Sequence, residues 1–377
     1  MKKVLVLLLS LFATKVMALD LTSYSKSAIM IEPTTNTVIY ELNKDERLAP
    51  ASMTKLMTML LIMESIDDGK INLSDSVLIS ENAAGMGGSQ VFLETNSKIE
   101  VEQLLKGIAI ASGNDAAVAM AEHIAGSTAE FVNMMTKKVK DLGLKNTHFV
   151  NVHGLDAENH YSTAYDMAMI ARELLSHEKI LEYTSLYEDY LVKPDGTKTW
   201  LVNTNKLVRF YEGVDGLKTG YTSVAKYCLT STANKNNIRF ITVVMGVDTS
   251  EHRSSDTTSM LNYGFTNYKL NTIVKSTDIV SSVPVYKGKK KSILVYPKVD
   301  VTDLIKQNED KKYSYNIDTY DLKAPVRKGD VVGQLEIVDN SGKVIRIVDL
   351  VSKSSVEKHN FISMFGEIFR NIINGYV

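Results

Sequence analysis

The sequence predicts a mixed α/β (α+β) domain with an antiparallel sheet and a helical subdomain, followed by a small all-β domain and a C-terminal amphipathic helix. Short strand-like runs joined by polar turns predict the sheet, and apolar stretches at helical spacing predict the helical subdomain. From about residue 271 only short β-rich runs occur, which predicts the second domain. The expected division is a leader over 1–18, a first domain over 19–270, an all-β domain over 271–356 and a terminal helix over 357–377.

The first elements are a hairpin and a buried helix. Ala28–Glu32 and Val38–Glu41 read as strands, because turn-forming residues separate them. Pro50 suits the first turn of a helix, and the apolar residues that follow it leave almost no polar face. This helix is therefore expected to be buried nearly all round.

The remaining elements of the first domain follow from the same patterns. Gly107–Gly126 predicts two packed helical segments with a break at Gly113. A helix over Ser162–Leu175 with Ser162 as its N-cap, strands over Lys226–Ala233 and Ile238–Val247, and a helix over Arg253–Tyr268 are expected next. In the second domain the expected strands are Ile279–Val285, Ser292–Val295, Val331–Val338 and Val344–Val351.

The composition is that of a globular chain and excludes some partners. Among 377 residues, Lys plus Arg number 43 and Asp plus Glu number 44, which gives a formal net charge of −1. A nucleic-acid binder needs a basic face, so no nucleic-acid partner is expected. Cys228 is the single cysteine, which rules out an internal disulfide, and we expect it in the core.

The N-terminus has the pattern of an export signal. Lys2 and Lys3 precede the short apolar run Val4–Ala13, and Val16-Met17-Ala18 has the small-residue pattern of a cleavage site. The alternative is an uncleaved membrane anchor, but the run is shorter than the roughly 20 residues that a spanning helix needs. We therefore expect an exported chain that begins at Leu19.

Three short motifs occur in order along the first domain: Ser52-Met53-Thr54-Lys55, Ser112-Gly113-Asn114 and Lys218-Thr219-Gly220. Ser52 and Lys55 are three residues apart, so their side chains share one helix face. A free lysine is a poor base, with a pKa of about 10.4, but burial and a nearby cation lower that pKa. The spacing thus favours Ser52 as a nucleophile and Lys55 as its base, with Lys218 as the second cation.

The other two motifs supply polar groups to the same cleft. Ser112 is the candidate proton relay and Asn114 the candidate ligand of a substrate amide, since both flank a helix break. Thr219 is a further candidate substrate contact, and Gly220 lets a substrate backbone approach an edge strand. The backbone N–H groups of Ser52 and Tyr221 are candidates for an oxyanion hole.

The chain resembles the low-molecular-mass penicillin-binding proteins, the serine D-Ala-D-Ala carboxypeptidases. The resemblance rests on Pro50–Thr58, Ser112–Ala116 and Val214–Thr222 and extends over nearly the whole chain. It implies a penicillin-binding/β-lactamase-like transpeptidase domain that acts on peptidoglycan stem peptides ending in D-Ala-D-Ala and is inhibited by β-lactams. It also implies that Arg253 binds the terminal carboxylate of the substrate. No cofactor and no metal are expected.

Two departures from related patterns bear on function. Position 221 is Tyr where many relatives have His, so any side-chain role there is in doubt. No Glu-x-x-Leu-Asn segment is present, and class A β-lactamases use such a glutamate to hydrolyse their acyl-enzyme. Slow release of β-lactams is therefore expected. His153 and His160 are expected to be structural, because Ser/Lys chemistry does not need them.

Several alternatives stay open at this stage. One alternative is endopeptidase, transpeptidase or β-lactamase activity on the same scaffold, and another is a non-catalytic wall-binding or scaffolding protein. The terminal helix has a broad apolar face from Phe361 to Ile373, which favours binding to a membrane surface over docking on protein. Because few of its residues are basic, the anchoring is expected to be hydrophobic rather than electrostatic. The expected location is the outer face of the cytoplasmic membrane, within the cell envelope.

Overall fold

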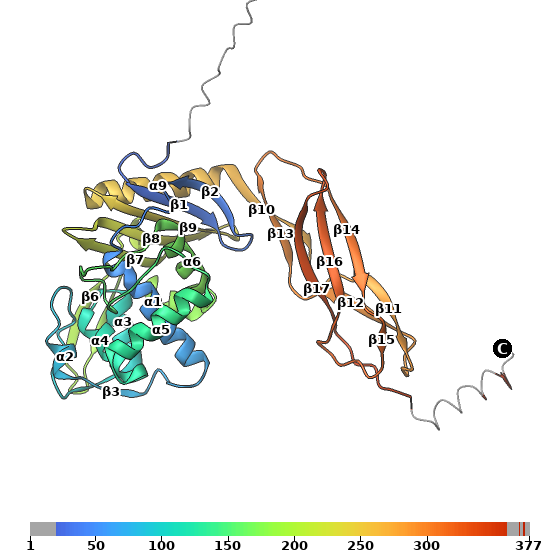
Figure 1. The fold of residues 1–377 in the computed structure, drawn as a ribbon, viewed down its shortest axis with the longest axis horizontal. Coiled ribbons are helices and arrows are strands. Elements are labelled where there is room, and N and C mark those ends of the chain that lie inside the picture. The colour runs from blue at the N-terminus through green and yellow to red at the C-terminus, as the bar shows by residue number, and fades with distance from the viewer. Residues whose placement is uncertain (1–19, 360–368, 370–371, 374–377) are drawn as a thin grey trace, which may run out of the picture.

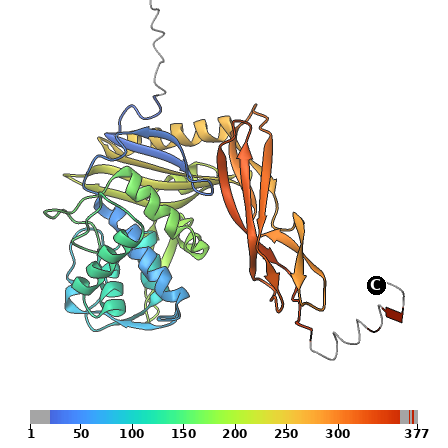
Figure 2. The ribbon, with the colours of Figure 1, turned by 45° about the vertical axis from the view of Figure 1, so that its right-hand side comes forward.

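The computed structural model describes residues 20–359 together with 369, 372 and 373 (Figure 1). The expected export signal lies outside the described residues, and so does most of the expected terminal helix. Phe369, Ile372 and Ile373 are helical and exposed. A mixed domain of helices and strands is followed by a second domain that consists of strands (Figures 1 and 2).

An antiparallel sheet of five strands forms the framework of the first domain. Its order is β2-β1-β9-β8-β7, so β7 lies at one edge. The strands are β1 (Ser27–Glu32), β2 (Thr37–Leu42), β7 (Val214–Thr222), β8 (Lys226–Lys235) and β9 (Ile238–Val247). All their pairings are antiparallel, which confirms the fold class that the hairpins predicted.

Alternate residues of the central strands enter two separate cores. Ile29 and Ile31 of β1 pack into the helical block, whereas Ala28 and Met30 pack under α9 (Ser250–Asn267) on the opposite face. Successive side chains of a strand point to opposite faces, so a strand buried on both sides reads as a continuous apolar run. The sheet is therefore a middle layer between α9 and the helical block (Figure 1).

The buried helix begins differently from the expectation. A 3₁₀ turn, η1 (Ala51–Thr54), precedes α1 (Lys55–Asp67), so Ser52 lies in the tighter turn and Lys55 opens the α-helix. Every residue from Lys55 to Met63 is buried, as the apolar sequence predicted. The two side chains still share a face, because 3₁₀ geometry aligns positions three residues apart.

Around α1 lie α3 (Val101–Ala109), α4 (Asn114–Ala125) and α6 (Ala164–Leu174). The break between α3 and α4 confirms the interruption expected at Gly113. The N-cap of α6 is Thr163, not Ser162, because the Thr163 hydroxyl accepts from Asp166 N at 3.0 Å. For the same reason α9 begins at Ser250 rather than Arg253: the Thr249 hydroxyl caps it by accepting from His252 N at 3.1 Å.

Smaller elements complete the first domain. They are β3 (Ser76–Leu78), α2 (Glu81–Ala84), β4 (Lys98–Glu100), α5 (Thr128–Asp141), η2 (Glu178–Ile180), α7 (Leu181–Thr184), β5 (Glu188–Val192), β6 (Lys198–Val202) and α8 (Leu207–Phe210). None of them was predicted, and α5 shows why. Only three of its residues are buried, so its apolar stripe is narrow.

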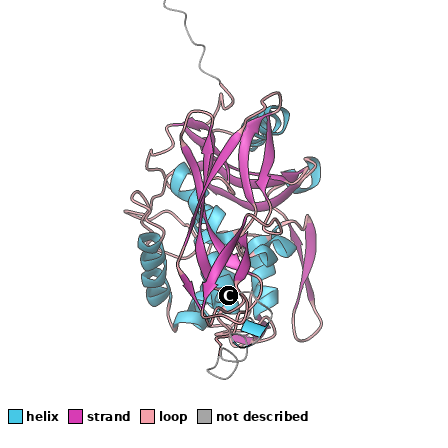
Figure 3. Cartoon of the chain, turned by 90° about the vertical axis from the view of Figure 1, so that its right-hand side faces the viewer, coloured by secondary structure: helices cyan, strands magenta, loops and turns pink. Residues whose placement is uncertain are grey.

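The second domain has a six-stranded sheet in the order β14-β16-β17-β12-β11-β15 and a separate β10–β13 pair. Figure 3 views the chain from the side of this domain and draws its strands in magenta. Its strands are β10 (Tyr268–Val274), β11 (Ser281–Tyr286), β12 (Ser292–Pro297), β13 (Val301–Lys306), β14 (Tyr313–Thr319), β15 (Leu322–Lys323), β16 (Val331–Asp339) and β17 (Val344–Ser352). The four predicted strands correspond to β11, β12, β16 and β17. Among the described residues, no helix has the length and apolar character needed to cross a bilayer.

Candidate active site

Ser52 and Lys55 meet at the junction of η1 and α1. Lys55 Nζ lies 3.0 Å from Ser52 Oγ, 2.6 Å from Asn114 Oδ1 and 2.7 Å from the carbonyl oxygen of His153. The Lys55 side chain is completely buried. A lysine at such a position requires polar partners, and three of them surround its amine.

Electrostatics disfavours a charge on this amine. Burial holds the pKa of Lys55 well below its ordinary value, and the neighbouring charge of Lys218 lowers it further. The carboxylate of Asp115 opposes both effects. Removal of water raises the free energy of the cation more than that of the neutral amine, so the neutral form is favoured.

The second motif occupies the turn between α3 and α4. Ser112 has a φ of 63° and is almost fully buried, and Asn114 is the first residue of α4. Asn114 was expected to hold a substrate amide. In the structure its Oδ1 accepts from Lys55 and its Nδ2 donates to Gly87 O at 2.7 Å, so both ends of the amide are engaged within the protein.

Asp115 holds a loop beside this turn. Its carboxylate accepts from the backbone N–H groups of Val91 (3.0 Å) and Leu93 (3.2 Å). Asp115 is almost fully buried, so these bonds are sheltered from water. Sequence reasoning missed this residue as a support of the site, although it lies within the segment Ser112–Ala116.

The third motif lies in the edge strand β7. Lys218 is buried and its Nζ donates to Thr219 O at 3.1 Å, while Thr219 Oγ1 donates to Thr204 Oγ1 at 2.7 Å. Burial lowers the pKa of Lys218 to about 7, and the charge of Arg253 contributes to that shift. In the described part of the chain β7 pairs with β8 alone, which leaves its other edge available to an extended peptide.

Two glycines let the backbone close in around Ser52. A Cβ at Gly220 would lie 2.8 Å from Pro50 O, and a Cβ at Gly154 would lie 1.9 Å from Ala51 O. Gly220 was expected to admit a substrate backbone. The structure gives it another reason, the close packing of β7 against η1.

Replacing Gly154 with alanine is expected to destabilise the protein more than an ordinary left-handed glycine would. Gly143 is the matched control, with a φ of 68° against 94° and no atom within 4 Å of the position that an added methyl group would take. Both alanines carry the cost of a positive φ, but only Gly154→Ala adds overpacking, which costs about 1–3 kcal/mol. Denaturant unfolding of both variants measures the difference, and equal free energies of unfolding would contradict the packing role.

Tyr221 and Arg253 lie beyond the third motif. Tyr221 is 56% exposed, and its ring centroid is 4.4 Å from that of Tyr227. Arg253, in the first turn of α9, is 7% exposed and sits 5.9 Å above the Tyr227 ring. Its Nε has no hydrogen-bond partner among the described residues. A buried guanidinium with an unpaired donor is suited to an anion supplied by a ligand.

Burial favours the neutral form of both histidines near the site. His160 Nδ1 accepts from Val150 N at 3.0 Å, so its proton is on Nε2, which donates to Thr54 Oγ1 at 2.8 Å. Burial lowers the pKa of His153 and of His160 to about 4.

Cys228 is buried opposite Gly220 in the β7–β8 pair, and burial raises the pKa of its thiol to about 11.

The structure thus brings Ser52, Lys55 and Asn114 into direct contact. Lys218 lies close enough to lower the pKa of Lys55, and Arg253 lies close enough to lower the pKa of Lys218. Ser112 lies in the turn two residues before Asn114. No cluster of three or more metal-ligating side chains occurs within the part of the chain that the structure describes.

Comparison with known proteins identifies the family. The profile of the D-alanyl-D-alanine carboxypeptidase family matches residues 13–249, and that of the penicillin-binding protein 5 C-terminal domain matches residues 268–358. The D-alanyl-D-alanine carboxypeptidase DacF of Bacillus subtilis is 50% identical over 348 residues, which cover 91% of this chain and 89% of that protein. DacA of Escherichia coli K12 is 36% identical over 353 residues, covering 91% and 86%.

Solved structures give the same answer for the fold. Penicillin-binding protein 5 of Haemophilus influenzae superimposes with a TM-score of 0.74 at 33% identity, covering 89% of this chain and 98% of that one. PBP3 of Streptococcus pneumoniae gives 0.75 at 28% identity, covering 89% and 99%. The fold and the family match are those of a serine-type peptidase. The chain belongs to the D-alanyl-D-alanine carboxypeptidase family of penicillin-binding proteins.

Proposed function

We propose that this enzyme removes the terminal D-Ala from peptidoglycan stem peptides that end in D-Ala-D-Ala, through an acyl-enzyme on Ser52. The observation that carries the proposal is the contact of 3.0 Å between Ser52 Oγ and the buried Lys55 amine. A neutral amine has two N–H donors and one lone pair. Asn114 Oδ1 and His153 O accept the two donors, which leaves the lone pair for the Ser52 hydroxyl.

Acylation then follows in balanced steps. Lys55 takes the Ser52 proton as Oγ attacks the carbonyl carbon of the penultimate D-Ala, and the N–H groups of Ser52 and Tyr221 stabilise the oxyanion. The C–N bond breaks, and Ser112 relays the proton from Lys55 to the leaving amine of D-Ala. Water next hydrolyses the ester by the reverse proton path, which releases the shortened peptide and restores Ser52.

Three groups position the substrate in this proposal. The open edge of β7 accepts the extended peptide by backbone pairing, with Thr219 and Gly220 beside the scissile bond. Arg253 binds the terminal carboxylate, which its unpaired Nε supports. Lys218 adds to the effect of burial in lowering the pKa of Lys55 and supplies positive potential for an anionic substrate.

Replacing Lys218 with methionine is expected to move the acidic limb of acylation to higher pH. At low pH the Lys218 cation disfavours protonation of Lys55, so removing it raises the pKa of Lys55. Because only neutral Lys55 serves as base, more hydroxide is then needed to reach the same rate. The second-order rate constant for labelling by a fluorescent penicillin, measured against pH, tests this. An unshifted limb, or one displaced to lower pH, would contradict the coupling.

Release of D-Ala from an acyl-D-Ala-D-Ala peptide is the direct test of the activity. Transfer of the acyl group to an added amine in place of release would instead indicate a transpeptidase. Fast β-lactam turnover would indicate a β-lactamase, although the lack of a Glu-x-x-Leu-Asn segment favours slow turnover and hence inhibition by β-lactams. Peptidoglycan binding with no release would indicate a wall-binding protein.

We further propose that the chain is exported and held at the outer face of the cytoplasmic membrane. Residues 1–18 serve as the signal peptide and residues 357–377 as an interfacial helix, with domains over 19–270 and 271–356 between them. The exposure of Phe369, Ile372 and Ile373, between 59% and 70%, supports an apolar face that lacks a protein cover.

A further inference from the structure

A basic turn joins β11 to β12 in the second domain. It consists of Lys287, Lys289, Lys290 and Lys291, all of them exposed. Lys323 of β15 is the Cα partner of Tyr286, the residue just before this turn, and Lys358 pairs with Gly288 within it. Six lysines from three separate stretches of the sequence therefore meet at one place.

Among the described residues, two carboxylates near the turn offset part of this charge. Glu357 pairs with Lys289, and Asp321 directly precedes β15. The chain as a whole carries a formal net charge of −1. The positive charge of the basic turn is therefore a local concentration and does not reflect a basic protein. The six lysines give this end of the domain a positive potential that an anionic surface attracts.

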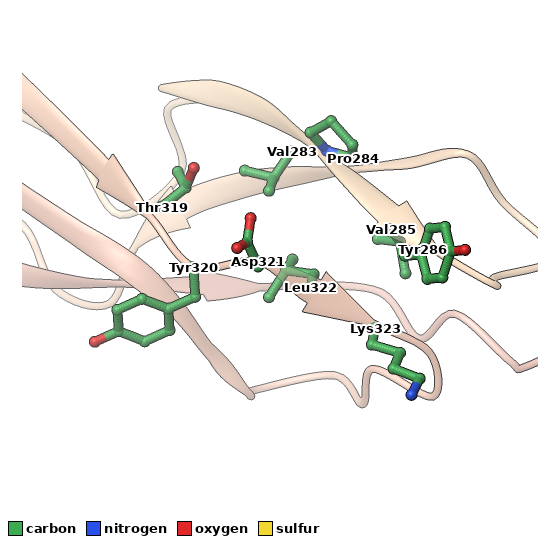
Figure 4. Close-up of a pocket in the computed structure, with 9 residues that line it drawn as sticks. All are labelled: Val283, Pro284, Val285, Tyr286, Thr319, Tyr320, Asp321, Leu322 and Lys323. Carbon is green, nitrogen blue, oxygen red and sulfur yellow. The ribbon is translucent and has the colours of Figure 1, made fainter.

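An exposed aromatic side chain and an apolar groove lie beside the basic turn. Tyr286 is 68% exposed, and Lys287 Nζ lies 5.5 Å from the centre of its ring. Beside it runs a groove of about 620 Å³ with a largely apolar lining that includes Val283, Pro284 and Leu322 (Figure 4). Figure 4 shows Tyr286 and Lys323 at the same end of this groove. Tyrosine and lysine side chains are the anchors typical of a membrane–water interface.

Residues 357–359, the last continuous stretch that the structure describes, contact the basic turn. His359 N donates to Lys287 O at 3.0 Å, and Lys289 N donates to Glu357 O at 2.9 Å. The segment 360–377 follows immediately, and its only charged residues are Glu367 and Arg370. That segment therefore supplies apolar contact but no net charge. Figure 1 places β11 and β15 at the end of the second domain remote from its junction with α9.

We propose that the basic turn, with Lys323, Lys358 and Tyr286, is a second membrane-binding element that contacts anionic lipid headgroups. The inference rests on the proposed membrane association of residues 357–377 and deepens it. One apolar anchor alone gives marginal, reversible binding, and a polybasic patch beside it makes the attachment stable. The basic turn contacts Glu357 and His359, just before residues 360–377 begin, so the turn and that segment can engage one surface together.

The test is sedimentation of the chain from Leu19 onward with lipid vesicles. We expect tighter binding to vesicles that contain phosphatidylglycerol than to phosphatidylcholine alone, with the difference lost at high salt. The triple variant K287Q/K290Q/K291Q is expected to weaken binding to the anionic vesicles by about 10- to 100-fold and to leave binding to neutral vesicles unchanged. It spares the Lys289–Glu357 pair.

The matched control is K98Q/K145Q/K179Q, which removes the same charge from exposed positions of the first domain and is expected to change binding less than about twofold. Equal weakening by both triples would overturn the basic turn as a site. So would a triple that still binds anionic vesicles normally but loses binding to purified cell walls, because the partner would then be a wall polymer. Absence of binding to either vesicle would overturn membrane association itself, while leaving the carboxypeptidase assay unaffected.

Discussion

Replacing Ser52 with alanine is expected to lower the rate of D-Ala release by at least about 10⁴-fold, the order seen when a serine hydrolase loses its nucleophile. Ser52→Ala removes one oxygen from a half-buried position in η1, and Lys55 keeps its bonds to Asn114 and His153. The fold is therefore expected to be retained. A D-Ala release assay measures the rate, and thermal unfolding checks that the variant is folded.

Ser112→Ala is the comparison that gives this result its meaning. A proton relay contributes less than a nucleophile, so we expect a loss of about 10²- to 10⁴-fold with covalent labelling by penicillin still detectable. If Ser52→Ala retained labelling while Ser112→Ala abolished it, the two serines would have exchanged roles.

Replacing Lys55 with methionine is expected to reduce acylation by about 10²- to 10⁴-fold, the usual contribution of a general base. Methionine has a similar volume and no lone pair that accepts the Ser52 proton. Lys55→Arg is expected to be equally impaired, because a guanidinium stays protonated at every accessible pH. The rate of penicillin labelling at several pH values measures both variants.

The control for this prediction is Lys179→Met, which removes an exposed lysine from the first domain. It is expected to acylate at the rate of the unaltered enzyme. Retention of activity by Lys55→Arg would count against the base role, since it would show that a positive charge suffices at this position.

The sequence predicted that Ser52 and Lys55 lie together, but it did not predict the contacts that surround them. Ser52 and Lys55 were predictable as a pair because their spacing of three places them on one face of any helical turn. The engagement of Asn114 by Lys55 and Gly87 was not, since it depends on the path of a loop that Asp115 holds at Val91 and Leu93. Nothing local in the sequence specifies that path.

The fold shows the same division between local and long-range information. Strands buried on both faces, such as β9, are continuous apolar runs and were predicted within a few residues. The strand β14 was missed, although its run Tyr-Ser-Tyr-Asn-Ile-Asp-Thr alternates aromatic or apolar residues with polar ones, and both of its faces are largely exposed in the structure. Its antiparallel pairing with β16 supplies the backbone hydrogen bonds that stabilise the strand.

The basic turn illustrates the limit most clearly. Lys287–Lys291 is visible as a charge run, but its proximity to Lys323 and Lys358 arises from the β11–β15 pairing and the return of residues 356–359. From the sequence alone, anchoring was expected to be purely hydrophobic. The structure adds a charged surface to that expectation.

The proposed reaction requires that Ser52 Oγ forms the ester bond of the acyl-enzyme. Peptide mapping by mass spectrometry after reaction with benzylpenicillin tests this most directly. We predict a single covalent adduct on the peptide that contains Ser52, absent from Ser52→Ala. An adduct on another residue, or no adduct on folded and active enzyme, would contradict the account.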